Sequence, residues 1–210
     1  MNSEIQKVLN GESDGCIVCA DCLEVMADMP DGCVDAVVTD PPYGLDFRGE
    51  KWDANIPDWF TDAMRVSGGQ MIFTTGPTTQ WDYPRPDWVF CLHREAANSR
   101  TTAGGFSHWT PVLAYGTWKL SPDVLKYHAI SHAKKRGFGH PSPKPDIVGS
   151  WLVLEAGGLI LDPFCGSGTT CVAAKKMGRK YIGIDIDEKY CRIARNRIAN
   201  TEKPLFPNNA

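Results

Sequence analysis

The chain of 210 residues contains no run of 18 or more apolar residues and no cationic leader followed by an apolar stretch. The first absence argues against a membrane-spanning helix and the second against a secretory signal, so we expect a cytoplasmic protein without a membrane partner. Internal repeats and low-complexity blocks are also lacking. With 42% hydrophobic residues, the chain can bury the core of one domain. We expect that domain to span residues 1–200, followed by a loose tail over 201–210.

A net excess of positive charge is missing as well, since the formal net charge is −3. This does not exclude a nucleic-acid partner, because the distribution of charge matters more than its sum. Residues 1–62 carry fourteen carboxylates against three Lys or Arg side chains, whereas residues 94–144 carry eight Lys or Arg against two carboxylates. We expect the middle of the chain to face phosphates, with binding that weakens steeply as salt rises. A basic solvated loop without a ligand is the alternative interpretation.

Eight cysteines are present, but no complete set of metal ligands accompanies them. The spacing Cys16-x-x-Cys19-x-x-Cys22 is close to that of zinc or iron–sulfur ligands. On one extended strand, however, Cys16 and Cys19 would point to opposite faces and could not bind one ion. His128 and His132 lie four residues apart, but their basic neighbours favour a phosphate-contacting loop. We therefore expect small buried thiols and no metal site.

The segment Asp40-Pro41-Pro42-Tyr43 follows the apolar run 34–39, which is expected to form a strand. Two adjacent prolines fix φ at about −65° and have no N–H, so the Asp40 and Pro41 carbonyls lack a local donor. A flat amino group could donate one hydrogen to the Asp40 carboxylate and the other to the Pro41 carbonyl, while Tyr43 stacks on the attached ring. The segment thus predicts a grip for a planar amine. A simple turn with Tyr43 in the core is the alternative.

A second motif combines a buried strand, a glycine turn, a helix, another strand and an acidic residue. The strand over 159–162 enters the turn Asp162-Pro163-Phe164-Cys165-Gly166-Ser167-Gly168-Thr169-Thr170, and helices are expected over 171–177 and 188–199. The strand over 180–185 ends at Asp185, which is placed to accept hydrogen bonds from two ribose hydroxyls. Gly166 and Gly168 let the backbone approach a ligand closely. The motif predicts a nucleoside ligand.

Two other nucleotide-binding patterns fit this turn less well. A nicotinamide fingerprint requires the third glycine of G-x-G-x-x-G, whereas here Gly168 is followed by Thr169-Thr170-Cys171. A phosphate loop requires a Gly-Lys-Ser/Thr ending, which the turn does not have.

The two motifs together resemble those of the DNA amino-methyltransferases that use S-adenosylmethionine, in the beta arrangement where the catalytic tetrapeptide precedes the cofactor loop. The resemblance covers most of the chain and depends on four segments in order. They are Ala20-Asp21, Asp40 to Tyr43, His140-Pro141-Ser142-Pro143-Lys144-Pro145, and Asp162 to Gly168. Ala20 departs from the family's usual glycine, but the carboxylate of Asp21 stays available.

The fold that this resemblance implies is α/β. It is a doubly wound, mostly parallel sheet of about seven strands, of the Rossmann-like methyltransferase type with circularly permuted motif order. The residue pattern adds strands over 70–75, 88–93 and 109–115 and a helix over 57–66. We further expect the loop 43–56 to close over a target, and a short basic target-recognition insertion at about 119–139.

The same resemblance implies roles for single residues. Asp40, Pro41, Pro42 and Tyr43 would form the catalytic segment. Asp21 would meet the adenine amino group of the cofactor, and Asp185 its ribose. The methionine part would be wrapped by Asp162, Pro163, Phe164, Gly166, Gly168 and Thr169, with Lys144 near its carboxylate. For Asp21 an ordinary strand-end turn residue, and for Lys144 a solvated loop lysine, stay open as alternatives.

The activity implied is site-specific methylation of an exocyclic amino nitrogen in double-stranded DNA, after the base is turned out of the stack, as in restriction–modification. Adenine is the preferred target because the Asp-led tetrapeptide is more usual for adenine in this family. Cytosine at N4 is the alternative, and a non-catalytic nucleic-acid-binding module that keeps the scaffold is an alternative of another class. Relatives often pair as dimers, so a homodimer is a further expectation.

Overall fold

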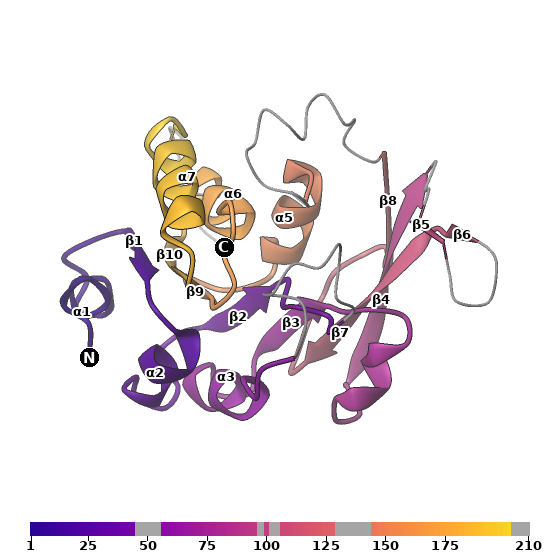
Figure 1. The fold of residues 1–210 in the computed structure, drawn as a ribbon, viewed down its shortest axis with the longest axis horizontal. Coiled ribbons are helices and arrows are strands. Elements are labelled where there is room, and N and C mark those ends of the chain that lie inside the picture. The colour runs from indigo at the N-terminus through magenta and orange to yellow at the C-terminus, as the bar shows by residue number, and fades with distance from the viewer. Residues whose placement is uncertain (45–55, 96–98, 101–105, 129–143, 203–210) are drawn as a thin grey trace.

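The computed structural model of the chain describes residues 1–44, 56–95, 99–100, 106–128 and 144–202 (Figure 1). Its centre is an eight-stranded sheet in the order β1–β10–β9–β2–β3–β7–β4–β8. The strands are β1 (Gly15–Cys19), β2 (Ala36–Thr39), β3 (Met71–Thr74), β4 (Trp88–Glu95), β7 (Trp109–Tyr115), β8 (Val124–His128), β9 (Leu159–Asp162) and β10 (Lys180–Asp185). The short strands β5 (Ser99–Arg100) and β6 (Phe106–Ser107) pair separately.

The sheet is mostly parallel, and among the described residues its two antiparallel pairings both involve β7, which lies between β3 and β4. The expected α/β, mostly parallel architecture is therefore confirmed. The strand count is eight in place of about seven, because Val124–His128 pairs in parallel with β4 at the edge of the sheet. These residues belong to the segment 119–139 that we expected to be an insertion.

Helices cover both faces of the sheet. In Figure 1, α2 and α3 lie on one face, and α5, α6 and α7 lie on the other. The helices are α1 (Ser3–Leu9), α2 (Cys22–Ala27), α3 (Phe60–Val66), the 3₁₀ helix η3 (Thr79–Asp82), α5 (Asp146–Val153), α6 (Thr169–Lys176) and α7 (Glu188–Ala199). Every helix of the described ranges is too short or too polar to cross a lipid bilayer.

Each face of the sheet carries its own hydrophobic core. Along β2, Val38 packs into the cluster under α5 and α6, while the neighbouring Val37 packs into the cluster that includes residues of α1, α2 and α3. Ile160 and Leu161 divide in the same way along β9. Alternate side chains of a strand point to opposite faces, so a strand covered by helices on both sides must be apolar throughout. This is why the runs at 36–39 and 159–161 are continuous in apolar residues.

The cysteine run at 16–22 is not one extended strand. The strand β1 ends at Cys19, and α2 begins at Cys22 with Asp21 as its N-cap. The Asp21 Oδ1 atom accepts a hydrogen bond from the Leu23 N–H at 2.8 Å, as capping carboxylates do. The expected strand that carries both Cys16 and Cys19 is therefore confirmed, and Cys22 lies on a helix.

Several expected features lie outside the described residues. These are most of the loop 43–56, the insertion beyond His128, the segment 140–143 and the tail from 203 onward.

Candidate active site

Four neighbouring parallel strands lead into an aspartate at the same edge of the sheet. In spatial order, β1, β10, β9 and β2 lead to Asp21, Asp185, Asp162 and Asp40. Because all four strands run in the same direction, the aspartates lie at the carboxyl edge, where open α/β sheets bind their ligands. At a strand spacing of about 4.8 Å, the row extends over roughly 15 Å. Residues distant in the sequence thus form one continuous acidic edge.

The middle of this row is a topological switch point. After β2 the chain leads to α3 on one face of the sheet, whereas after β9 it leads to α6 on the opposite face (Figure 1). In open α/β sheets, the point between two strand ends where the connections diverge in this way is where ligands bind. A hydrogen bond from Thr39 Oγ1 to Asp162 Oδ1, 2.6 Å long, joins β2 to β9 at this point. The expected amine grip and the expected glycine turn are therefore neighbours.

The Asp40 carboxylate is held by three side chains. Its Oδ1 atom accepts hydrogen bonds from Thr74 Oγ1 and from Tyr43 Oη, the latter at 2.7 Å. Its Oδ2 atom forms an ion pair of 2.5 Å with Lys144 Nζ. The Asp40 side chain is still 34% exposed, so it is open on one side. Pro41 is buried and Pro42 half-buried beside it.

Charge and burial act in opposite directions on this carboxylate. Burial raises the pKa of Asp40, but the charge of Lys144 and the hydrogen bonds from Lys144, Thr74 and Tyr43 outweigh it and bring the pKa below its ordinary value. Burial and the neighbouring Asp40 charge raise the pKa of Tyr43 well above 10. Near neutral pH the pair is therefore a carboxylate beside a neutral phenol.

Asp185 is half-buried and anchors the glycine turn. Its Oδ2 atom accepts from the Gly166 N–H at 2.8 Å, and its Oδ1 atom accepts from the Asp187 N–H at 2.9 Å. A carboxylate offers about four lone-pair positions, so two stay open to a ligand. Asp21 has one oxygen engaged in its helix cap, and within the described ranges no hydrogen bond reaches the other. This donor-poor, acceptor-rich pair suits the hydroxyl and amino groups of a nucleoside.

The two glycines of the turn have left-handed backbone, with φ of 49° at Gly166 and 79° at Gly168. A Cβ atom at Gly168 would lie 2.8 Å from the Cβ of Ala194 on α7. Glycine at 168 is therefore required by the packing of α6 and α7, a requirement that the local sequence does not reveal. Close approach of a ligand to this backbone stays a prediction.

Three further residues of the turn are held by the protein itself. Phe164 is half-buried, with its ring 5.5 Å from that of the buried Trp59. Pro163 is buried, and Thr169 is the first residue of α6. Arg197 of α7 donates to the Ser167 carbonyl at 2.6 Å and to Thr169 Oγ1 at 3.3 Å. These contacts fix the shape of the turn.

Asp162 differs from the other three aspartates because it is only 3% exposed. It accepts hydrogen bonds from Thr39 Oγ1 and, at 3.2 Å, from the Phe164 N–H. Burial raises its pKa to about 6, although these hydrogen bonds act in the opposite direction. Its observed contacts join β9 to β2 and to the start of the glycine turn, and a contact with cofactor stays a prediction.

Replacing Asp162 by Asn is expected to flatten the pH dependence of stability between about pH 4 and 6. A carboxyl whose folded pKa is raised, here from 3.8 to about 6, stabilises the fold at low pH, and this contribution is lost as pH rises through the folded value. The loss amounts to about 3 kcal/mol at most. Asn keeps an oxygen for Thr39 and Phe164 but has no proton to lose. Urea unfolding of the parent and of Asp162→Asn at several pH values measures the free energy of unfolding of each. Parallel curves of this free energy against pH would contradict a raised pKa of Asp162.

One residue of the site was not predicted, and a predicted one has a different partner from the one we expected. Thr74, the last residue of β3, donates to Asp40, and Lys144 pairs with Asp40 although we expected it near a cofactor carboxylate. A polar residue ending the apolar strand 71–74 was the available signal for Thr74. The segment 140–145 marked Lys144 as a site residue, but nothing in the sequence indicated its pairing with Asp40.

Comparisons with known proteins place the chain among methylases. A family model described as DNA methylase matches residues 117–196. YubD of Escherichia coli (strain K12), a protein named only provisionally as a methylase, is 30% identical over 217 residues, covering 88% of this chain and 90% of YubD. The solved M1.HpyAVI–SAM complex is 20% identical with a TM-score of 0.65, covering 87% of this chain and 99% of that chain. PvuII DNA methyltransferase, named as cytosine-N4-specific, is 16% identical with a TM-score of 0.67, covering 94% and 88%.

Proposed function

Because the chain belongs to the family of S-adenosylmethionine-dependent DNA amino-methyltransferases that act at N6 of adenine or N4 of cytosine, we propose that it methylates the N6 amino group of adenine at a specific sequence in duplex DNA. The observation that carries this proposal is the row of four aspartates. In this row, the residues that we propose to bind a nucleoside lie next to those that we propose to hold the amine, on either side of one switch point.

The cofactor would lie along the row, in the order of the strands. Asp21 would accept from the adenine amino group and Asp185 from the ribose hydroxyls, using the oxygens that their own backbone contacts leave open. The turn from Asp162 to Thr169 would border the methionine part. When bound, the cofactor supplies an electrophilic sulfonium methyl group. Its approach from the Asp162 side would bring that group toward Asp40.

Asp40 would act mainly by positioning. Three of its roughly four lone-pair positions are occupied by Thr74, Tyr43 and Lys144, which leaves one for an N–H of the target amine. The Pro41 carbonyl would accept the second hydrogen. An aromatic amine is a weak nucleophile because its lone pair is delocalised, and two fixed acceptors favour a more tetrahedral nitrogen in the transition state. The lowered pKa of Asp40 makes it a weak base, which favours this positioning role.

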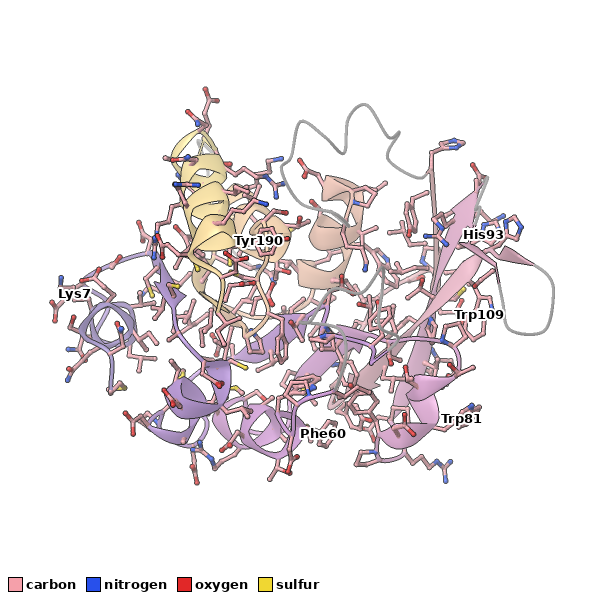
Figure 2. All side chains as sticks on the ribbon, in the orientation of Figure 1. Lys7, Phe60, Trp81, His93, Trp109 and Tyr190 are labelled. Atoms are coloured by element: carbon pink, nitrogen blue, oxygen red, sulfur yellow. The ribbon has the colours of Figure 1, made fainter. Side chains whose placement is uncertain are left out.

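The target base would have to leave the double helix, because its amino group is out of reach inside the stack and turning it out costs a few kcal/mol. Tyr43 would then cover its ring. Charge favours approach from the β4–β8 side, where Lys126 and His128 are exposed. Figure 2 shows His93 and Trp109 at this end of the molecule, far from Lys7 at the acidic N-terminal end.

Adenine is proposed over cytosine because the tetrapeptide begins with Asp40. The test is incubation with methyl-labelled cofactor and duplex DNA of mixed sequence, followed by digestion to nucleosides. We expect the label in N6-methyladenine. Label in N4-methylcytosine would overturn the choice of base, and an absence of label in DNA, from protein shown to bind the cofactor, would overturn the activity.

Replacing Lys144 by Met is expected to shift the acid limb of the pH profile of kcat/KM to higher pH. The ammonium keeps Asp40 ionised at low pH, and burial alone would raise its pKa. The acid limb reports this group in the free enzyme. The matched control is Lys176→Met, which breaks the exposed ion pair with Asp146 and should leave the profile unchanged. An unshifted limb in Lys144→Met would show that the pair is not formed in solution.

A further inference from the structure

Three potential metal ligands lie together beside the turn that carries Asp185. They are Cys19, the last residue of β1, and Glu188 and Cys191 at the start of α7. One ligand atom from each lies within 4.8 Å of the others. Cys19 and Glu188 are exposed and Cys191 is buried. This group is distinct from the Cys16, Cys19 and Cys22 pattern seen in the sequence, since only Cys19 is common to both.

The fold brings these ligands together through two local rules. Cys19 pairs with Asp185 in the parallel register of β1 and β10, so it lies beside the end of β10. Residues three apart on a helix share a face, which places Glu188 and Cys191 on the same side of α7. The Cys191 Sγ atom lies 3.4 Å from the Asp185 carbonyl, and the Cys19 Sγ atom lies 3.7 Å from the Ile186 carbonyl. The two thiols therefore border both sides of the turn.

The spacing and the donor types suit a thiophilic divalent ion. Zinc binds sulfur at about 2.3 Å and carboxylate oxygen at about 2.0–2.2 Å, so the ligands of one ion lie within roughly 4.6 Å of each other. Small side-chain rotations would bring the three atoms into this range. Two thiolates with one carboxylate favour zinc or cadmium over magnesium or calcium, which prefer oxygen. The exposed side would leave a fourth position for water.

Charge around the site is compatible with a bound cation. Arg195 donates to Glu188 Oε1 at 2.8 Å and would leave the other carboxylate oxygen for the ion. With both thiols deprotonated, the three anionic ligands balance one guanidinium and one divalent ion. The arrangement is therefore neutral when occupied.

We propose that Cys19, Glu188 and Cys191 form a solvent-open binding site for a zinc-like, thiophilic divalent ion on the turn that carries Asp185. The ion would link the end of β1 to α7 and stabilise the folded chain. The proposal does not depend on methyl transfer.

Affinity should increase with pH, because the thiols must lose protons to bind. Binding should therefore release protons to the buffer.

The test uses the full chain, reduced with a phosphine. It is titrated with Cd²⁺ while the thiolate-to-metal charge-transfer absorption is followed. It is also titrated with Zn²⁺ by calorimetry in two buffers of different protonation enthalpy, which measures proton release. We expect one ion per chain, proton release, and loss of the absorption band in Cys19→Ser and in Cys191→Ser. Glu188→Gln should weaken binding at least about tenfold, since even loss of a group that only orients a metal ligand costs about 10- to 100-fold. Cys33→Ser and Cys16→Ser are the matched thiol controls and should bind as the parent does.

Two outcomes would overturn the proposal. One is the absence of a stoichiometric ion at thiol-competent pH. The other is binding that survives Cys19→Ser but is lost in Cys16→Ser or Cys33→Ser. Because Cys19 is exposed, Cys19→Ser is expected to fold. This variant therefore tests the proposed site even if Cys191→Ser does not fold.

Discussion

Asp40→Asn is expected to reduce kcat for DNA methylation by about 10²- to 10³-fold or more, while the Kd for S-adenosylmethionine changes by no more than about twofold. The Asn side chain has one acceptor oxygen, whereas Asp40 accepts from Thr74, Tyr43 and Lys144 and would still have to accept from the target amine. The NH₂ group of the Asn side chain would moreover face one or more of these donors, to which it cannot form a hydrogen bond as an acceptor. Single-turnover kinetics with saturating cofactor measure the chemical step.

The control for Asp40→Asn is Asp28→Asn, which removes an exposed carboxylate at the end of α2. Asp40→Asn also leaves the Lys144 ammonium without its partner, at a cost of about 1–3 kcal/mol in the free energy of unfolding. The double variant Asp40→Asn with Lys144→Met removes that unpaired charge, and it should be as inactive as the single variant. Strong residual activity in a folded Asp40→Asn protein would show that the amine is held elsewhere.

Asp185→Asn is expected to weaken cofactor binding by about 10- to 100-fold. Hydrogen bonds to a charged group contribute about 1.5–3 kcal/mol each, and about 1.4 kcal/mol corresponds to a factor of ten. The carboxylate uses one oxygen for Gly166 and the other for Asp187, so the amide NH₂ would face one of these N–H donors. Isothermal calorimetry with S-adenosylmethionine gives the affinity directly.

Asp187→Asn is the matched control for this prediction. Asp187 lies two residues away and caps α7 by accepting from the Lys189 N–H at 2.8 Å, a contact that Asn preserves. Cofactor affinity should therefore stay as in the parent chain. Equal affinities of Asp185→Asn and the parent would count against the ribose assignment.

Much of the fold was predictable because local signals agreed with each other. The bounds expected for β7, β10 and α7 match the structure. Helix α7 has Asp187 as its N-cap and Glu188 in its first turn, both of which are typical helix-start residues. The strand β8 was missed because it is a short edge strand of mixed composition, in which only Tyr127 is buried. Its strand structure comes from pairing with β4, which no local pattern contains.

The aspartates of the candidate site were easier to predict than the side-chain contacts that hold them. Asp21, Asp40, Asp162 and Asp185 each follow a strand, and parallel strands bring their carboxyl ends together. Two of the three partners of Asp40 come from far along the chain, since Thr74 is 34 and Lys144 is 104 residues away. The burial of Asp162 likewise depends on Thr39 of another strand. Such contacts follow from tertiary packing and leave no trace in spacing or composition.

The central claim is that the row of four aspartates directs a sulfonium methyl group at the amine grip of Asp40. A crystal structure with bound S-adenosylhomocysteine tests it most directly. The account predicts the adenine near Asp21, the ribose on Asp185, and the sulfur between the 162–168 turn and Asp40. A cofactor bound away from this edge, or one whose sulfur points away from Asp40, would contradict it.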